Sequence, residues 1–143
     1  MFDRPVKDVM RREKLLKAPP ETPVGKVAIL MASKSVSAVL VVVDERLLGI
    51  CTERDIVCRV VAKGLDAQAT RLDAVMTPEP QTIAPDRPFG AALLLMYERG
   101  FRHLPVTQDG KVVGIVSSRN ALDPSLEEFV SEEQRRKHFR QKG

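Results

Sequence analysis

The chain has 143 residues, of which 43% are hydrophobic and 29% charged, with a net charge of +4, so it suits one compact unit or two small halves packed together. Tryptophan is absent and aromatic residues make up 4%, which predicts an aliphatic core. No run of about 18 apolar residues exists, and the N-terminus lacks the apolar run of a secretory signal, so we expect a cytoplasmic protein without a membrane-spanning segment.

The first half of the chain predicts a β-α-β-β-α unit in which Val9-Met10 comes before the first helix. Pro23 precedes this helix, whose apolar residues are three and four apart and so form one buried face: Val24, Val27, Ala28 and Met31. A hairpin is expected next, with strands at residues 38–43 and 47–52 and a turn at residues 44–46. A second helix is predicted from Glu53 to a break at residues 63–66. Cys51 and Cys58 have no histidine at metal-ligand spacing, so neither a zinc site nor a disulfide framework is predicted.

The second half predicts the same order of elements. Val75-Met76 comes first, and Pro88 precedes a helix with the same apolar spacing: Phe89, Ala92, Leu93 and Met96. Strands are expected at residues 103–107 and 112–117, joined by a turn that contains Asp109-Gly110. A further helix begins near Arg119 and is interrupted at Asp123-Pro124.

The two halves align when the sequence is shifted by 65 residues, without a gap from Pro23 to Asp55. The identical pairs are Pro23 and Pro88, Gly25 and Gly90, Met31 and Met96, Val41 and Val106, Asp44 and Asp109, Gly49 and Gly114, Ile50 and Ile115, and Arg54 and Arg119. Such self-similarity indicates a repeat architecture. A single unit of this size buries little surface, so we expect the two to pack together.

The last part of the chain predicts a charged helix over residues 125–140. Its acidic residues come early and its basic residues late, which complements the helix dipole, and Glu132–Arg136 and Glu133–Lys137 are supporting pairs four residues apart. This helix packs on the protein's own dimer or serves to dock a partner protein or nucleic acid. The predicted divisions are a first repeat (residues 5–63), a linker (64–70), a second repeat (71–123) and a charged tail (124–143).

One motif that carries chemistry is Thr52-x-x-Asp55, where a strand ends and a helix begins. At the least it predicts a helix cap, with Thr52 at the N-cap and Asp55 in the first turn. A carboxylate in this position also has the oxygens to accept hydrogen bonds from both hydroxyls of a ribose, beside helix N–H groups that favour phosphate. The second copy reads Ser117-x-x-Asn120, in which the neutral amide of Asn120 divides its capacity between donor and acceptor.

These features resemble the CBS domain pair, or Bateman module, over about residues 5–123. The segments that carry the resemblance are Val9-Met10, Val75-Met76-Thr77 and residues 49–55, 100–106 and 114–120. The resemblance implies a mixed α/β (α+β) fold of two β-α-β-β-α repeats packed with pseudo-twofold symmetry, followed by a C-terminal helix. The chain is similar to bacterial proteins that consist of little besides such a pair.

The resemblance also implies a nucleotide-binding site. The residues placed there are Lys14, Leu16, Ala38, Thr52, Asp55, Met76, Thr77, Arg102, His103, Ser117 and Asn120. The Asp55 position is the family's usual ribose contact, and the Ser/Thr position helps to hold phosphate. Arg102 and His103 match positions where cations lie near phosphate, although a solvated surface role for Arg102 and a structural hydrogen bond for His103 are the simpler interpretations.

The implied function is a regulatory module without catalytic residues, a required cofactor or a metal. Its ligand would be AMP, ADP or ATP, with S-adenosylmethionine or NAD less favoured; it would form a homodimer and act on an unknown partner protein in trans. One alternative is a scaffold or dimerisation module that has lost ligand binding, which the Asn120 departure allows. Another is a nucleic-acid-binding accessory protein that uses the basic tail. The sequence does not name the ligand, the partner or the signal.

Overall fold

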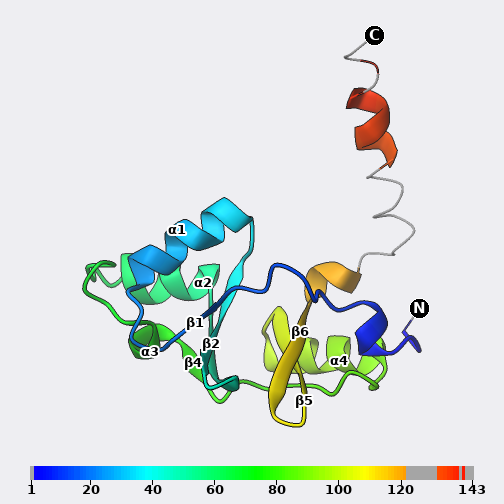
Figure 1. Ribbon diagram of the computed structural model, residues 1–143, viewed down its shortest axis with the longest axis horizontal. Helices are drawn as coiled ribbons and strands as arrows, with labels where there is room; N and C mark the ends of the chain where they lie inside the picture. The colour runs from blue at the N-terminus through cyan, green and yellow to red at the C-terminus, as the bar shows by residue number, and fades with distance from the viewer. Residues whose placement is uncertain (1, 122–131, 139, 141–143) are drawn as a thin grey trace.

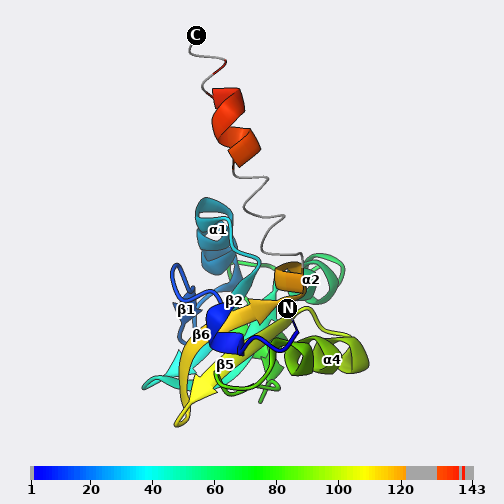
Figure 2. The same cartoon turned by 90° about the vertical axis from the view of Figure 1, so that its right-hand side faces the viewer.

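The computed structural model describes residues 2–121, 132–138 and 140 of the chain (Figure 1). Two similar units lie side by side, each with a hairpin and a long helix (Figure 1), and Figure 2 shows them from the side of the second repeat. In chain order the elements are η1 (Val6–Asp8), β1 (Lys17–Ala18), α1 (Val24–Lys34), β2 (Ala38–Val43), β3 (Arg46–Thr52), α2 (Glu53–Asp55), η2 (Ile56–Val61), α3 (Leu72–Val75), β4 (Thr77–Pro78), α4 (Phe89–Arg99), β5 (His103–Gln108), β6 (Lys111–Ser117) and η3 (Ser118–Ala121). The mixed α/β fold and the predicted order of helices and hairpins are confirmed.

Each unit is built on an antiparallel hairpin. The turn residues Asp44 and Glu45 have φ of 50° and 66°, and Asp109 and Gly110 have φ of 54° and 80°, the left-handed values that two-residue hairpin turns require. The two hairpins meet in one sheet of order β1-β2-β3-β6-β5, with β4 also paired to β3. The sheet joins them at a single residue pair, Arg46 with Lys111.

The internal repeat is visible in the strand register. Ala18 pairs with Val41 in a parallel arrangement, and Ile83 pairs with Val106 in the same way. Thr77 pairs with Ile50, and Arg11 pairs with Ile115. These pairs are related by shifts of 65 or 66 residues, so the two halves of the chain are structural copies and not only similar sequences.

The first segment of each repeat packs into the hydrophobic core of the other repeat. Val6, near the start of the chain, is fully buried in the core of the second hairpin and α4, whereas Leu72 and Val75 are buried in the core of the first hairpin and α1. Gly49 and Gly114 permit this packing, because a Cβ at Gly114 would lie 2.9 Å from the carbonyl oxygen of Arg11 and would meet the Met10 side chain. The interlocked halves therefore bury more apolar surface than either half alone could.

The chain after each hairpin differs between the halves. In the first half Thr52 caps α2 through a capping box with Asp55, as the sequence predicts, and the helix continues as the π-type segment η2. In the second half the residues after β6 form the 3-10 helix η3 over Ser118–Ala121, where this described stretch of the chain stops. The predicted C-terminal helix is observed over residues 132–138, where Arg136 and Glu133 form an ion pair at 3.1 Å; residues 125–131 lie outside the described residues.

Two further observations concern the described residues. Within the described part of the chain, no helix combines the length and apolar character needed to cross a bilayer. Likewise, residues 2–121, 132–138 and 140 contain no cluster of three or more His, Cys, Asp or Glu side chains that could hold a metal ion.

Candidate functional site

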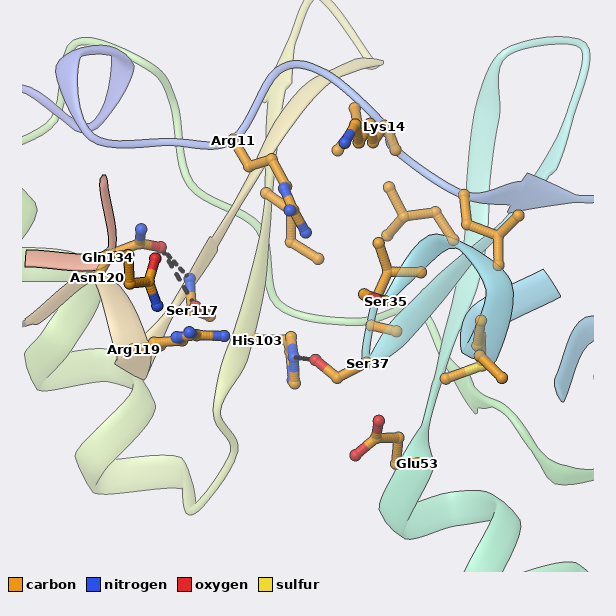
Figure 3. Close-up of a pocket in the computed structure, with 18 residues that line it drawn as sticks. Arg11, Lys14, Ser35, Ser37, Glu53, His103, Ser117, Arg119, Asn120 and Gln134 are labelled. Carbon is orange, nitrogen blue, oxygen red and sulfur yellow. Dashed lines mark hydrogen bonds between the residues drawn. The ribbon is translucent and has the colours of Figure 1, made fainter. Parts of the chain in front are cut away.

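A cavity of about 970 Å³ lies between the two repeats, within the range of about 300–1,000 Å³ that is usual for small-molecule sites. Its walls come from the N-terminal segment, from the end of α1 and the start of β2 in the first repeat, and from β5, β6 and η3 in the second (Figure 3). A ligand in this cavity would therefore contact both copies of the repeat.

The N-terminal segment forms one wall because it crosses from one repeat to the other. Arg11 exchanges backbone hydrogen bonds with Ile115 of β6, at 2.8 and 3.0 Å. A few residues later the Leu16 carbonyl accepts a hydrogen bond from Leu40 of β2 at 2.9 Å. Between these anchors Lys14 has a φ of 57°, and the bend places Arg11 and Lys14 together at one edge of the cavity (Figure 3).

The opposite wall contains Ser117 and Asn120. The Asn120 side-chain oxygen accepts hydrogen bonds from the Ser117 backbone N–H at 2.8 Å and the Ser117 hydroxyl at 3.3 Å. These bonds fix the amide and leave its NH₂ group to donate to a ligand hydroxyl. Arg119 extends from the same turn toward His103 (Figure 3).

A hydrogen bond between the repeats lies at the floor of the cavity. The Ser37 hydroxyl is 2.7 Å from Nε2 of His103, just before β2 on one side and at the start of β5 on the other. Burial lowers the pKa of His103 below its ordinary value of 6.5; the charges of Glu53 and Asp55 oppose this shift and that of Arg102 adds to it. His103 is therefore mainly neutral at pH 7 and can exchange a hydrogen bond with Ser37 in either direction.

The charge of the cavity lining is predominantly positive. Arg11, Lys14 and Arg119 line it and are exposed, and in the described part of the chain none of the three forms an ion pair with a carboxylate. Glu53 is the acidic residue of the lining. Such a lining favours an anionic ligand.

The structure brings six of the residues expected from the sequence into this cavity: Lys14, Leu16, Ala38, His103, Ser117 and Asn120. Leu16 and Ala38 are buried, at 6% and 8% exposure, and offer the aliphatic surface expected against an adenine ring. The cavity thus lies at the Asn120 copy of the motif, whereas the family's usual ribose contact matches Asp55.

The other five expected residues lie outside the lining: Thr52, Asp55, Met76, Thr77 and Arg102. The Asp55 carboxylate accepts hydrogen bonds from the Thr52 backbone N–H at 2.9 Å and its hydroxyl at 3.2 Å, and Arg59 lies 3.6 Å away. Met76 packs against Gly49, and Thr77 pairs with Ile50 of β3. Arg102 is exposed, and the binding roles of all five residues stay predictions.

Arg11, Arg119 and Ser37 line the cavity but are not among the site residues expected from the sequence. Arg119 stands inside the Ser117-x-x-Asn120 motif and is repeated as Arg54, so the repeat offers a signal for it. Arg11 follows Val9-Met10 directly, but its position depends on the exchange of the N-terminal segment onto the second repeat. Ser37 depends on the approach of His103, 66 residues away.

The two cysteines lie apart from this chemistry. Cys51 is fully buried on β3, and burial raises the pKa of its thiol to about 12, so it is an unreactive core residue. Cys58 is exposed on η2.

Comparisons with known proteins identify the family. A sequence model described as the CBS domain matches residues 6–62 and 72–126. The chain therefore belongs to the CBS domain family and carries a tandem pair. The meiotically up-regulated gene 70 protein of Schizosaccharomyces pombe is 40% identical over 122 residues, which is 78% of this chain and 17% of that protein. The chain spans less than a fifth of the length of the first four curated relatives that it matches.

Solved structures support the same fold. An uncharacterised conserved protein from Pyrococcus horikoshii superposes with a TM-score of 0.80 at 30% identity, over 87% of this chain and 94% of that one. A CBS domain protein from Pyrobaculum aerophilum complexed with AMP superposes with a TM-score of 0.77 at 23% identity, over 90% of this chain and 99% of that one.

Proposed function

We propose that this CBS pair is a non-catalytic regulatory module that binds an adenosine-containing ligand, AMP, ADP or ATP, in the cavity between its repeats. The observation that carries the proposal is the cavity itself, whose size suits a nucleotide and whose lining joins the fixed Asn120 amide to aliphatic residues and cations. The AMP complex of the Pyrobaculum aerophilum CBS protein supports this choice of ligand class.

Each side of the cavity has a role in the proposed binding. The NH₂ group of Asn120 donates to a ribose hydroxyl, while Ser117 holds the amide in place. The adenine lies against Leu16 and Ala38. The cations of the lining face the phosphate.

Regulation would follow from the position of the cavity between two units. Its walls belong to both repeats, so a bound ligand stabilises the packing in which those walls are correctly spaced. A ligand shifts an equilibrium only by its difference in affinity for the two states. We propose that this bias is transmitted to a partner protein in trans.

We also propose a homodimer formed through the helices. Large apolar side chains are exposed on helices of both repeats: Ile29 at 66%, Val57 at 58%, Val61 at 69%, Leu94 at 57% and Tyr97 at 88%. Ile29 and Leu94 occupy equivalent positions in the two repeats. Exposed apolar side chains that recur in this way are typical of an association surface.

The test is isothermal titration of the purified protein with AMP, ATP and S-adenosylmethionine, with Asn120→Ala and Asp55→Ala measured beside the wild type. Saturable binding of AMP or ATP that is lost in Asn120→Ala supports the proposal and assigns the occupied cavity. Loss in Asp55→Ala alone assigns the ligand to the other copy of the motif. Absence of binding by all three compounds rejects the sensor role and favours the scaffold; salt-sensitive binding of nucleic acid by the tail favours the accessory-protein alternative.

A further inference from the structure

Each wall of the cavity has a counterpart around Asp55, because the two halves are structural copies. Arg11 pairs with Ile115 as Thr77 pairs with Ile50. His103 pairs with Ser117 as Ala38 pairs with Thr52. The comparison of equivalent positions therefore shows how the two copies of the site differ in charge.

The cation pair at the edge of the cavity is missing from the Asp55 copy of the site. Thr77 stands in place of Arg11, and Glu79 stands in place of Lys14. The backbone supports the second correspondence, because Lys14 and Glu79 both have left-handed φ values, 57° and 46°. A cation is thus replaced by a neutral residue in one case and by an anion in the other.

The remaining charges have to be weighed as well. Arg119 and Arg54 are equivalent and do not distinguish the copies. Two further cations lie on the Asp55 side: Arg102, where the cavity has Ser37, and Arg59, which is 3.6 Å from the Asp55 carboxylate. Asp55 and Glu79 are both anionic there and oppose these cations. In the cavity Asn120 is neutral, and Glu53 lies on the opposite edge from Arg11 and Lys14 (Figure 3).

We infer that the cavity at Asn120 selects adenosine ligands with two or three phosphates, through Arg11 and Lys14, and that the Asp55 copy lacks this selection. This inference rests on the proposed function of the cavity. The Asn120 amide and the aliphatic lining bind the nucleoside part, and Arg11 and Lys14 bind the phosphates beyond the first. The sulfonium cation of S-adenosylmethionine meets the same positive edge and binds more weakly than ATP.

The backbone arrangement keeps these two cations in place. Arg11 is held by two backbone hydrogen bonds to Ile115, and the chain is anchored again where Leu16 meets Leu40. The side chains of Arg11 and Lys14 take no part in these bonds. Their substitution therefore changes the charge of the cavity edge without removing the anchors of the N-terminal segment.

The experiment is titration of the full chain with adenosine, AMP, ADP, ATP and S-adenosylmethionine, without divalent cations and at fixed ionic strength. Arg11→Thr and Lys14→Glu install the residues of the other copy, singly and together. Glu79→Lys is the matched control, since it reverses charge at the equivalent position outside the cavity. Melting temperatures of the unliganded variants check that folding is retained.

In the wild type and in Glu79→Lys we expect affinity to rise from adenosine to ATP, with about tenfold or more separating AMP from ATP, the scale of one or two charge-assisted hydrogen bonds. In the double variant this rise is expected to disappear while adenosine binding is retained. Equal affinity for all phosphorylated forms in the wild type, or a rise that survives in the double variant, overturns the inference and leaves the proposed function standing. Failure of every compound, adenosine included, to bind the wild type overturns the proposed function and the inference with it.

Discussion

Ser37 and His103 are 66 residues apart in the chain, yet the Ser37 hydroxyl lies 2.7 Å from the His103 ring nitrogen Nε2. Ser37 precedes the first hairpin and His103 begins the second, so this bond joins the two repeats directly. Both residues line the cavity. A change in the spacing of the repeats, or a ligand bound in the cavity, is therefore expected to change this hydrogen bond.

We expect Ser37 and His103 to be energetically coupled. In a double-mutant cycle with Ser37→Ala and His103→Ala, a part-buried hydrogen bond of this kind contributes a coupling energy of about 1 kcal/mol. Urea unfolding of the four proteins measures it. Additive effects of the two substitutions would contradict a bond between the repeats.

The lowered pKa of His103 makes stability depend on pH. The folded protein binds a proton at His103 more weakly than the unfolded chain does, so protonation below the ordinary pKa of 6.5 favours unfolding. The contribution of neutral His103 is complete above pH 6.5 and is lost as the pH falls toward the lowered value. The free energy of unfolding, measured from about pH 8 to about pH 5, should fall less steeply in His103→Gln than in the wild type. Parallel profiles for the two proteins would contradict this assignment.

Asp55 has a structural role that is independent of any ligand. Its carboxylate accepts hydrogen bonds from Thr52, and its own N–H donates to the Thr52 hydroxyl. We expect Asp55→Ala to lower the free energy of unfolding by about 1 kcal/mol, the usual cost of a lost cap. Asp55→Asn should retain most of the stability, because Asn120 makes the equivalent bond to Ser117. Urea denaturation without ligand compares the two, and an equal loss in both variants would assign the stability to the carboxylate charge instead of the hydrogen bonds.

The proposed dimer predicts a change of assembly when charge is placed on the exposed helix faces. Ile29→Asp combined with Leu94→Asp should convert the dimer to a monomer, because each carboxylate would have to leave water on association. Sedimentation equilibrium measures the change. Ala84→Asp, in an exposed segment outside the helices, is the control and should remain dimeric. A wild type that is monomeric at all concentrations would contradict the proposed association.

The fold could be predicted largely from local patterns. The β-rich strands, the Asp-Gly turn and the helices after Pro23 and Pro88 each depend on neighbours in sequence, and the structure has them where they are expected. The repeat also predicts that two similar units pack together. The glycines that recur in both repeats mark close contacts between segments. Gly114 is required because the Met10 side chain and the Arg11 carbonyl lie against it.

The site could be predicted only in part. Ser117, Asn120, Leu16 and Ala38 follow from the repeated motif and the resemblance. The place of the cavity does not, because it depends on the path of the N-terminal segment across both repeats. Arg11 lies in the cavity only because this segment pairs with Ile115, a long-range contact that no local pattern contains.

The most direct test of the account is a crystal structure of the protein grown with excess ADP. We predict electron density for the nucleotide in the cavity between the repeats, with a ribose hydroxyl at hydrogen-bond distance from the Asn120 amide and the phosphates beside Arg11 and Lys14. Nucleotide bound beside Asp55 with the Asn120 cavity free of it, or no nucleotide at a concentration that saturates binding in solution, would contradict the account.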